Sequence, residues 1–351
     1  MIEDLASIEV GLPYVVQYNM LTKRKRRILF VVTLGGFVAL SIATLFYSLG
    51  YRVGPEWQIQ KTGGVFIRAN ETGADVFVDG KKSKTTSLLT QTALTKYLTP
   101  RTYEIRVTKE NFIAWQKLIL VTPEIVQARD VVLVPTQLPA RALGTTTPLY
   151  THYTIKNGTV SVHQNSTSSP LYQNVNKFWE LPKSNTLLVF GNNKTFYTEN
   201  RRSAGATTSL EFLITPSEYI PPEVPQTLMS LLLSKQNIIF SDDEQRVIFW
   251  DDHTIGSYWI GEEQKMPQWQ QTRALGVFAI PTRIREVITY PRHEDYLIAS
   301  MGNGIWMLEM DAVGGQNFIP LYQGANPQIV TKQGSSLVIF DAPLYYEIEL
   351  P

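Results

Sequence analysis

The 351-residue chain contains no cysteine and almost no excess of charge of either sign, and both deficits exclude functions. Without cysteine it has no disulfide, no thiolate zinc site, no iron–sulfur cluster and no cysteine nucleophile. Lys and Arg number 32 against 31 Asp and Glu, so no basic field draws the chain to nucleic acid. Charged residues are only 18%, whereas 44% of the residues are hydrophobic, which predicts packed cores rather than disorder.

Residue patterns typical of catalysis are also missing. The four histidines lie more than five positions apart, so no helix presents two of them to one metal; they are His152, His163, His253 and His293. The sequence contains neither a G-x-S-x-G elbow nor a phosphate-binding P-loop. We therefore expect no catalytic residue, no metal and no cofactor, and a protein that is not an enzyme.

Two acidic clusters remain as candidates for calcium or for a carboxylate pair. They are residues 241–244, Ser-Asp-Asp-Glu, and the pair Asp251 and Asp252. Their spacing matches no calcium loop. Because turns between strands are normally polar, we interpret both clusters as solvated turns.

The strongest local signal is an uncharged run over residues 28–51. About 20 apolar residues suffice for a helix to cross a bilayer. Five consecutive cations precede the run: Lys23, Arg24, Lys25, Arg26 and Arg27. Because such cations stay on the cytoplasmic side, we predict a cytoplasmic tail over residues 1–27 and an extracytoplasmic location for the remainder. This favours a cell-membrane protein with a single span and a signal anchor.

Two further interpretations of the same segment stay open. A cleaved signal peptide is one, although its apolar region is usually 7–15 residues long. The other concerns small residues at intervals of four on one helix face, namely Gly35, Ala39 and Ala43. Because small residues allow helices to approach closely in lipid, this spacing indicates a possible dimer through the span.

After a predicted stalk over residues 52–62, short strands with turn signals begin. Residues 74–78 run directly into Asp79 and Gly80. Asp-Gly between apolar strands is a strong hairpin signal, because both turn positions need positive φ. Residues 103–108 alternate apolar and polar, which is typical of a half-buried strand. The pattern predicts a small β-sandwich, in which Asp79 and Gly80 serve only as a turn.

Residues 63–135 resemble the PEGA domain family. The resemblance rests on the opening strand at 63–67, on Glu71-Thr72-Gly73-Ala74 at the name motif, and on the Asp79–Gly80 turn. Leu98-Thr99-Pro100 followed by the strand at 103–107 is similar to another family segment, as are Asn111-Phe112 and Trp115. The chain departs from the pattern at Asn70, where proline is usual, and at Arg101 and Asn111, where glycine is usual. The resemblance implies an extracytoplasmic structural or interaction module, with no catalytic residues.

The segment 136–351 repeats one pattern: an apolar strand, a polar Gly/Asn/Asp turn and an aromatic-rich strand. Four copies begin at Thr186, Arg246, Tyr296 and Leu337, spaced by 60, 50 and 41 residues, and a fainter copy occupies residues 149–162. Such periods are typical of four-stranded propeller blades, so we predict an irregular β-propeller-like domain of about five blades. A stack of β-sandwiches is the competing architecture.

Aromatic residues of this segment are the remaining binding candidates. Tryptophans on an exposed face can anchor a partner or stack on sugars. Trp259 and Trp269 flank a polar stretch, so with Tyr258 they form the candidate binding surface, although packing within a blade explains them as well.

The sequence as a whole predicts a mainly β protein with an N-terminal transmembrane helix, a PEGA-like sandwich and a propeller-like domain. The expected function is interaction or scaffolding with envelope proteins or glycans in a prokaryote. Two alternatives remain. One is an anchored glycan hydrolase whose carboxylates come from separate blades. The other is a sensor or assembly subunit that contacts a cytoplasmic partner through residues 1–20.

Overall fold

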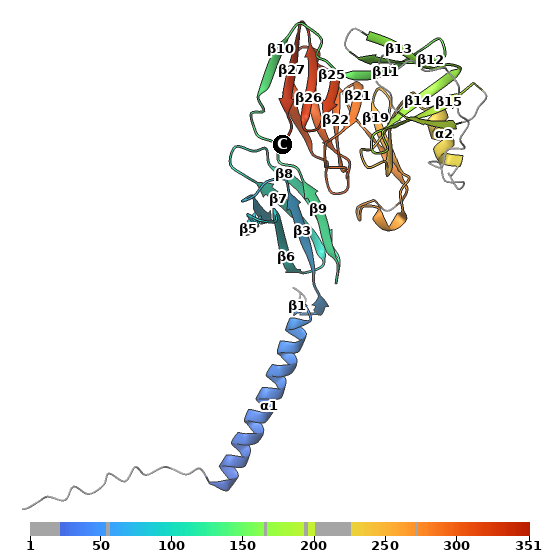
Figure 1. Ribbon diagram of the computed structural model, residues 1–351. Helices are drawn as coiled ribbons and strands as arrows, with labels where there is room; N and C mark the ends of the chain where they lie inside the picture. Colours follow the sequence, from blue (N-terminus) through green and yellow to red (C-terminus); the bar gives the residue numbers. More distant parts are fainter. Residues whose placement is uncertain (1–21, 54–56, 165–166, 193–195, 201–225, 271) are drawn as a thin grey trace, which may run out of the picture. The chain divides into compact units, whose positions relative to one another are not determined.

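The computed structural model describes residues 22–53, 57–164, 167–192, 196–200, 226–270 and 272–351, and these are mostly β (Figure 1). The chain divides into two compact units, Met1–Lys61 and Thr62–Pro351. The first holds the long helix and a short hairpin. The second holds the sandwich and the repeats.

The helix of the first unit, α1, spans Lys23–Ser48, and its apolar side chains are exposed. It is long and apolar enough to cross a membrane, a property that it shares with signal sequences. It begins before the predicted span because the five cations are good helix formers. It ends at Ser48, and Tyr51 then enters β1 (Tyr51–Val53), which pairs antiparallel with β2 (Ile59–Lys61). This hairpin occupies the predicted stalk, whereas residues 1–21 of the predicted tail lie outside the described residues.

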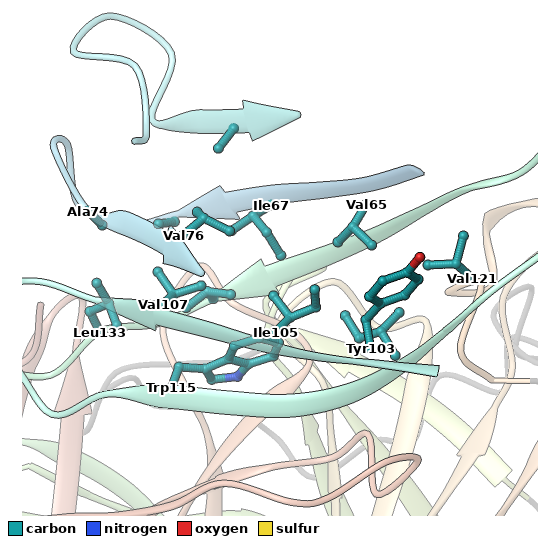
Figure 2. Close-up of a cluster of buried hydrophobic side chains, with 14 residues drawn as sticks. Val65, Ile67, Ala74, Val76, Tyr103, Ile105, Val107, Trp115, Val121 and Leu133 are labelled. Carbon is teal, nitrogen blue, oxygen red and sulfur yellow. The ribbon is translucent and has the colours of Figure 1, made fainter. Parts of the chain in front are cut away.

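The second unit begins with a sandwich of two sheets. One sheet has the order β5-β4-β7-β8 and the other β6-β3-β9, with β3 parallel to β9. The strands are β3 (Gly63–Ala69), β4 (Asp75–Val78), β5 (Lys81–Thr85), β6 (Thr92–Leu98), β7 (Arg101–Thr108), β8 (Trp115–Val121) and β9 (Val126–Val131). Inward-pointing side chains alternate along these strands and form one apolar core around Trp115 and Ile105 (Figure 2).

The residues that depart from the family pattern have clear local roles. Asn70, in place of proline, bonds to both the N–H and the C=O of Leu133 through its side-chain amide. Asn111, in place of glycine, has φ 64°, a conformation that asparagine tolerates well. Arg101 pairs with Asp79, which has φ 48° and forms with Gly80 (φ 76°) the two-residue turn between β4 and β5.

The repeat region consists of five consecutive antiparallel sheets. The first two have the orders β11-β12-β13 and β14-β15-β16, the next two β17-β18-β19-β20 and β21-β22-β23-β24, and the last β25-β26-β27-β10. Their strands are β10 (Ala140–Gly144), β11 (Thr151–Lys156), β12 (Thr159–Gln164), β13 (Thr167–Tyr172), β14 (Val175–Leu181), β15 (Thr186–Gly191), β16 (Phe196–Asn200), β17 (Asn237–Phe240), β18 (Arg246–Trp250), β19 (Thr254–Trp259), β20 (Ala274–Ala279), β21 (Ile284–Thr289), β22 (Tyr296–Met301), β23 (Gly304–Glu309), β24 (Phe318–Gln323), β25 (Gln328–Gln333), β26 (Ser336–Asp341) and β27 (Leu344–Glu349). Helix α2 (Gln226–Ser234) precedes β17, and a 3-10 turn, η1 (Glu263–Lys265), lies between β19 and β20.

All five predicted hairpins form, one in each sheet. The four clear copies supply the second and third strands of their sheets, whereas the faint copy supplies the first two, β11 and β12. The last sheet joins both ends of the region, because β10 pairs with β27. First strands of neighbouring sheets lie in contact, β11 with β14, β14 with β17, and β21 with β25. This is the propeller-like arrangement that the repeat predicts.

The sandwich and the repeat region share one stretch of chain, residues 131–134. Val131 and Leu133 point into the sandwich core, whereas Val132 and Val134 point into a core of the fourth and fifth sheets. All four are fully buried. The sequence places the domain boundary just beyond this stretch, at 135/136. The two cores meet within a single extended segment, because its side chains alternate between them.

Candidate functional site

The predicted binding surface of Tyr258, Trp259 and Trp269 is not exposed. These side chains expose 6%, 3% and 9% of their area, so the expectation that they lie at the surface is wrong. The reason is local: the indole of Trp259 donates a hydrogen bond from Nε1 to the carbonyl of Glu262, at 3.0 Å, and so turns inward under the polar stretch.

The two indoles instead flank a buried cation, Arg246. Its guanidinium carbon lies 5.3 Å and 5.4 Å from the ring centroids of Trp259 and Trp269. Nη1 donates to the carbonyl oxygen of Glu294 at 2.8 Å, and Nη2 lies 3.5 Å from Oδ1 of Asp295. Burial lowers the pKa of Arg246 and raises that of Asp295, and the attraction between the two opposes both shifts.

The acidic turn at residues 241–244 is only partly solvated, with Ser241 and Glu244 buried and Asp242 and Asp243 half-buried, because it joins four sheets. Asp242 of the third sheet accepts a hydrogen bond from Thr289 of the fourth at 2.7 Å, and lies 2.6 Å from Nζ of Lys332 of the fifth. Glu244, 3% exposed, accepts from the N–H of Ser184, in the second sheet, at 2.7 Å. The turn carboxylates therefore form hydrogen bonds and an ion pair between sheets, and do not act as calcium ligands.

Two carboxylates from separate sheets also converge. Glu294 follows β21, and burial, followed by a hydrogen bond with Asp243, raises its pKa to about 7. Asp243 belongs to the turn between β17 and β18, where its Oδ1 accepts from the N–H of Gln245 at 3.0 Å. A carboxyl of raised pKa beside a second carboxylate is the arrangement that a two-carboxylate hydrolase uses for its general acid.

A buried ion network joins the sandwich to the repeat region. Lys117 of β8 has a fully buried side chain whose Nζ lies 2.7 Å from Oε1 of Glu309 and 3.1 Å from Oδ2 of Asp311. It also donates to the carbonyl oxygen of Asp311 at 2.6 Å. Nε of Arg129, on β9, lies 3.3 Å from Oδ2 of Asp311. Burial raises the pKa of Glu309, and the charge of Lys117 opposes that shift. These four charges neutralise one another at the junction.

Sequence reasoning missed this network, although one signal was present. Strand β8 alternates Trp115, Lys117, Ile119 and Val121 on its inward face. A lysine at an inward position of a strand indicates a buried partner of opposite charge. The identity of that partner was not accessible, because Glu309 lies almost two hundred residues away.

A cleft of about 220 Å³ opens beside this network, between the sandwich and the repeat region. Its walls carry two arginines, four carboxylates and two aromatic rings: Phe66, Arg68, Arg129, Asp130, Trp269, Asp295, Glu309 and Asp311, with Ala128, Pro267 and Gln268. Arg68 holds Asp130 through two hydrogen bonds of 2.6 Å. Each carboxylate lies beside a cation, and the aromatic rings add apolar wall. A concave site of mixed polar and aromatic lining is suited to a small polar ligand or to a protruding side chain of a partner.

The histidines are dispersed, with one exception that the sequence did not reveal. His152 and His163 face each other across β11 and β12, with ring centroids 4.8 Å apart. Burial, followed by the neighbouring His163, lowers the pKa of His152. The turn at Asn157 places Lys156 opposite Thr159. Counting residue by residue outward along the two strands then places His152 opposite His163. Among the described residues, no group of three or more potential ligands is placed to hold a metal ion.

Comparison with known proteins bears on the sandwich and on the repeats separately. Residues 62–137 match the model of the PEGA domain family, close to the 63–135 expected from the sequence. A search of curated proteins gave no match.

Solved structures similar to this chain include one β-propeller domain and two other proteins. YCF48 from Cyanidioschyzon merolae is 11% identical, with a TM-score of 0.29, and the alignment covers 71% of this chain and 80% of that one. The Cps50 (Swd1) β-propeller domain of Myceliophteria thermophila is 9% identical, with a TM-score of 0.28 and the same coverage. Dihydro-heme d1 dehydrogenase NirN is 11% identical, with a TM-score of 0.27; the alignment covers 58% of this chain and only 42% of NirN. The match to the PEGA family and the five sheets together describe a sandwich followed by a propeller-like region.

Proposed function

We propose that this protein is a membrane-anchored interaction or scaffold protein. Helix α1 would hold it in the cell membrane, and the sandwich and repeat region would face the extracytoplasmic side, toward envelope proteins or glycans. The match to the PEGA family and the propeller-like sheets support an interaction role, because neither brings a catalytic motif with it. Five cations at the start of α1 support a cytoplasmic N-terminus.

The observation that carries the proposal is the junction of sandwich and repeat region. Lys117, Glu309 and Asp311 form a buried ionic network there, and residues 131–134 belong to both cores. A module joined in this way holds the two domains together, and the 220 Å³ cleft is lined by residues of both. We assign partner binding to this cleft.

Cosedimentation of the full chain, in detergent, with the insoluble envelope fraction of the source organism tests this function. We expect saturable pelleting that Arg68→Ala weakens, because Arg68 lines the cleft. Arg141→Ala is the matched control, since Arg141 is likewise an exposed arginine paired with one carboxylate, Glu347, but lies on β10. Equal pelleting by the two variants would show that the partner binds somewhere other than the cleft. No pelleting at all would refute binding to insoluble envelope material.

The proposed topology is testable because the chain has no cysteine of its own. In cells, Leu149→Cys, whose position is 71% exposed in the structure, should react with a membrane-impermeant maleimide. Ser7→Cys should react only after the membrane is permeabilised. The reverse pattern would invert the topology, and loss of residue 7 from the mature protein would favour a cleaved signal peptide. Crosslinking between Ala39→Cys copies would test the proposed dimer through the face of Gly35, Ala39 and Ala43.

Two alternative functions have their own tests. The hydrolase alternative is favoured by the raised pKa of Glu294 beside Asp243, and it predicts release of reducing sugar from envelope glycan that Glu294→Gln abolishes. The sensor alternative depends on residues 1–20, which lie outside the described residues. Deleting those residues while keeping α1 would abolish a cytoplasmic role and leave an external one unchanged.

A further inference from the structure

The sandwich has two edges, and they differ in what they contact (Figure 1). The edge made by β8 and β9 faces the repeat region. There the N–H of Leu118 donates to the carbonyl of Gly314 at 2.8 Å, and the hydroxyl of Tyr296 donates to the carbonyl of Asp130 at 2.9 Å. The opposite edge is made by β5 and β6, which lie in contact and are joined by the turn at residues 86–91.

This turn displays two leucines to solvent. Leu88 is 78% exposed and Leu89 is 94% exposed, more than any other aliphatic side chain among the described residues. The turn is nevertheless well bonded. The N–H of Ser87 donates to the carbonyl of Thr92 at 2.9 Å, and that of Gln91 donates to the carbonyl of Ser87 at 3.0 Å. A hydrogen-bonded turn that holds adjacent leucines outward is a preformed apolar contact.

The two strands that lead to this apolar tip carry exposed lysines. Lys81, Lys82 and Lys84 are all exposed on β5, and Lys96 is exposed on β6. Asp75 offsets one of them through its ion pair with Lys82. Edge lysines commonly prevent strands from pairing with other molecules, which accounts for the cations but not for the leucines. Cations around an exposed apolar tip match an anionic bilayer, whose headgroups attract lysine and whose interface accepts leucine.

Only a short stretch of chain connects α1 to the sandwich. Helix α1 ends at Ser48, and Tyr51 pairs directly with Lys61, one residue before the second unit begins. The hairpin therefore shortens the connection from helix to sandwich to a few residues. If α1 spans the membrane, as the proposed function states, the sandwich stays within reach of the same bilayer.

We propose that the β5–β6 edge docks on the anionic surface of the bilayer that α1 spans, with Leu88 and Leu89 inserted at the interface. This inference rests on the proposed membrane anchoring. The sandwich would then lie against the lipid and set the orientation of the repeat region and its cleft.

The absence of cysteine allows a single reporter dye to test this docking. The full chain carrying Leu89→Cys, labelled with an environment-sensitive dye, is placed in nanodiscs of phosphatidylcholine with or without phosphatidylglycerol. We expect a blue-shifted, several-fold brighter emission with the anionic lipid, and quenching by brominated acyl chains. Leu149→Cys with the same dye is the control, because that exposed position lies in the repeat region.

The outcomes separate docking from anchoring. Coelution of the chain with nanodiscs reports whether α1 inserts, and the dye then reports docking on the chains that coelute. Lys81→Gln with Lys82→Gln and Lys84→Gln should remove the dependence on anionic lipid. A dye at residue 89 that stays as water-exposed as the dye at 149 would overturn the proposal. So would a dye that is shielded only when envelope protein is added, because the occupant would then be a protein.

Discussion

The sandwich and the repeat region bury their apolar side chains in different ways. The sandwich has one core, to which each of its sheets contributes. In the repeat region each apolar cluster lies between neighbouring sheets, so that every sheet shares its core with the next. A fold of the first kind is lost as a whole, whereas a row of sheets responds mainly next to the site of damage. The junction therefore determines whether a destabilising change in the sandwich also destabilises the repeat region, and the reverse.

The two regions also treat their carboxylates differently. In the sandwich, the half-buried Asp75 and the exposed Asp79 have lowered pKa values, because Lys82 and the N–H of Glu104 respectively donate to them. The repeat region has carboxylates of both kinds: desolvation raises the pKa values of the half-buried Glu286 and of Glu294 to about 7, whereas the pKa values of Asp251, Asp341 and Glu347 are lowered. Acid therefore weakens the contribution of Asp75 and Asp79, whereas Glu286 and Glu294 favour folding more as the pH falls.

The largest expected effect is at the junction. Lys117→Met leaves Glu309 and Asp311 buried without their main cation, and we expect the free energy of unfolding to fall by about 3–5 kcal/mol. Urea denaturation of the full chain, followed by tryptophan fluorescence, measures this loss.

Lys109→Met is the matched control for that variant. Lys109, like Lys117, is a lysine of the sandwich in an ion pair, but its partner is Glu71 and its side chain is 28% exposed. Removing its charge should therefore lower the free energy of unfolding by only about 0–1 kcal/mol. Similar losses for Lys117→Met and Lys109→Met would show that the junction network is solvated and does not join the two cores.

A smaller effect, with a defined pH dependence, is expected at Glu286 of β21. Its pKa is about 7 when folded, because of burial, against 4.5 for the free side chain. The group therefore favours folding below pH 4.5, and this contribution is lost as the pH rises from 4.5 to 7. Glu286→Gln should stabilise the chain at pH 8 by up to about 3 kcal/mol and leave it unchanged at pH 4.5.

Thermal unfolding of both proteins across that range measures the difference. Asp75→Asn serves as the comparison, because the pKa of Asp75 is shifted the opposite way. A Glu286→Gln effect that does not depend on pH would mean that this carboxylate is ionised in the folded protein.

Much of this fold follows from local pattern. The Asp79–Gly80 turn, the alternation along β7 and the five hairpins follow from chemistry within a few residues, and the structure has all of them. Pairing β10 with β27 was less accessible, because the sequence shows only that a strong strand ends the chain.

The candidate site was much harder to predict. The polar residues between them predict Trp259 and Trp269 at the surface, yet both indoles lie buried beside the guanidinium of Arg246. The cleft combines Arg68 of the sandwich with Asp295 of the repeat region, and their meeting depends on how two domains pack. Side chains that come together only through packing leave no mark on the local pattern of either segment.

The smallest expected effect is also the most direct test of the shared segment. Val131 points into the sandwich core and Val132 into the core of the fourth and fifth sheets, and both are fully buried. Changing either to alanine removes two methyl groups and should cost about 2 kcal/mol. Native-state hydrogen exchange locates the loss. Val131→Ala should speed exchange mainly in β3 and β7, and Val132→Ala mainly in β22 and β26. If both variants speed exchange equally in both regions, a loss of stability on one side of the junction is shared by the other. The sandwich and the repeat region then unfold as one unit.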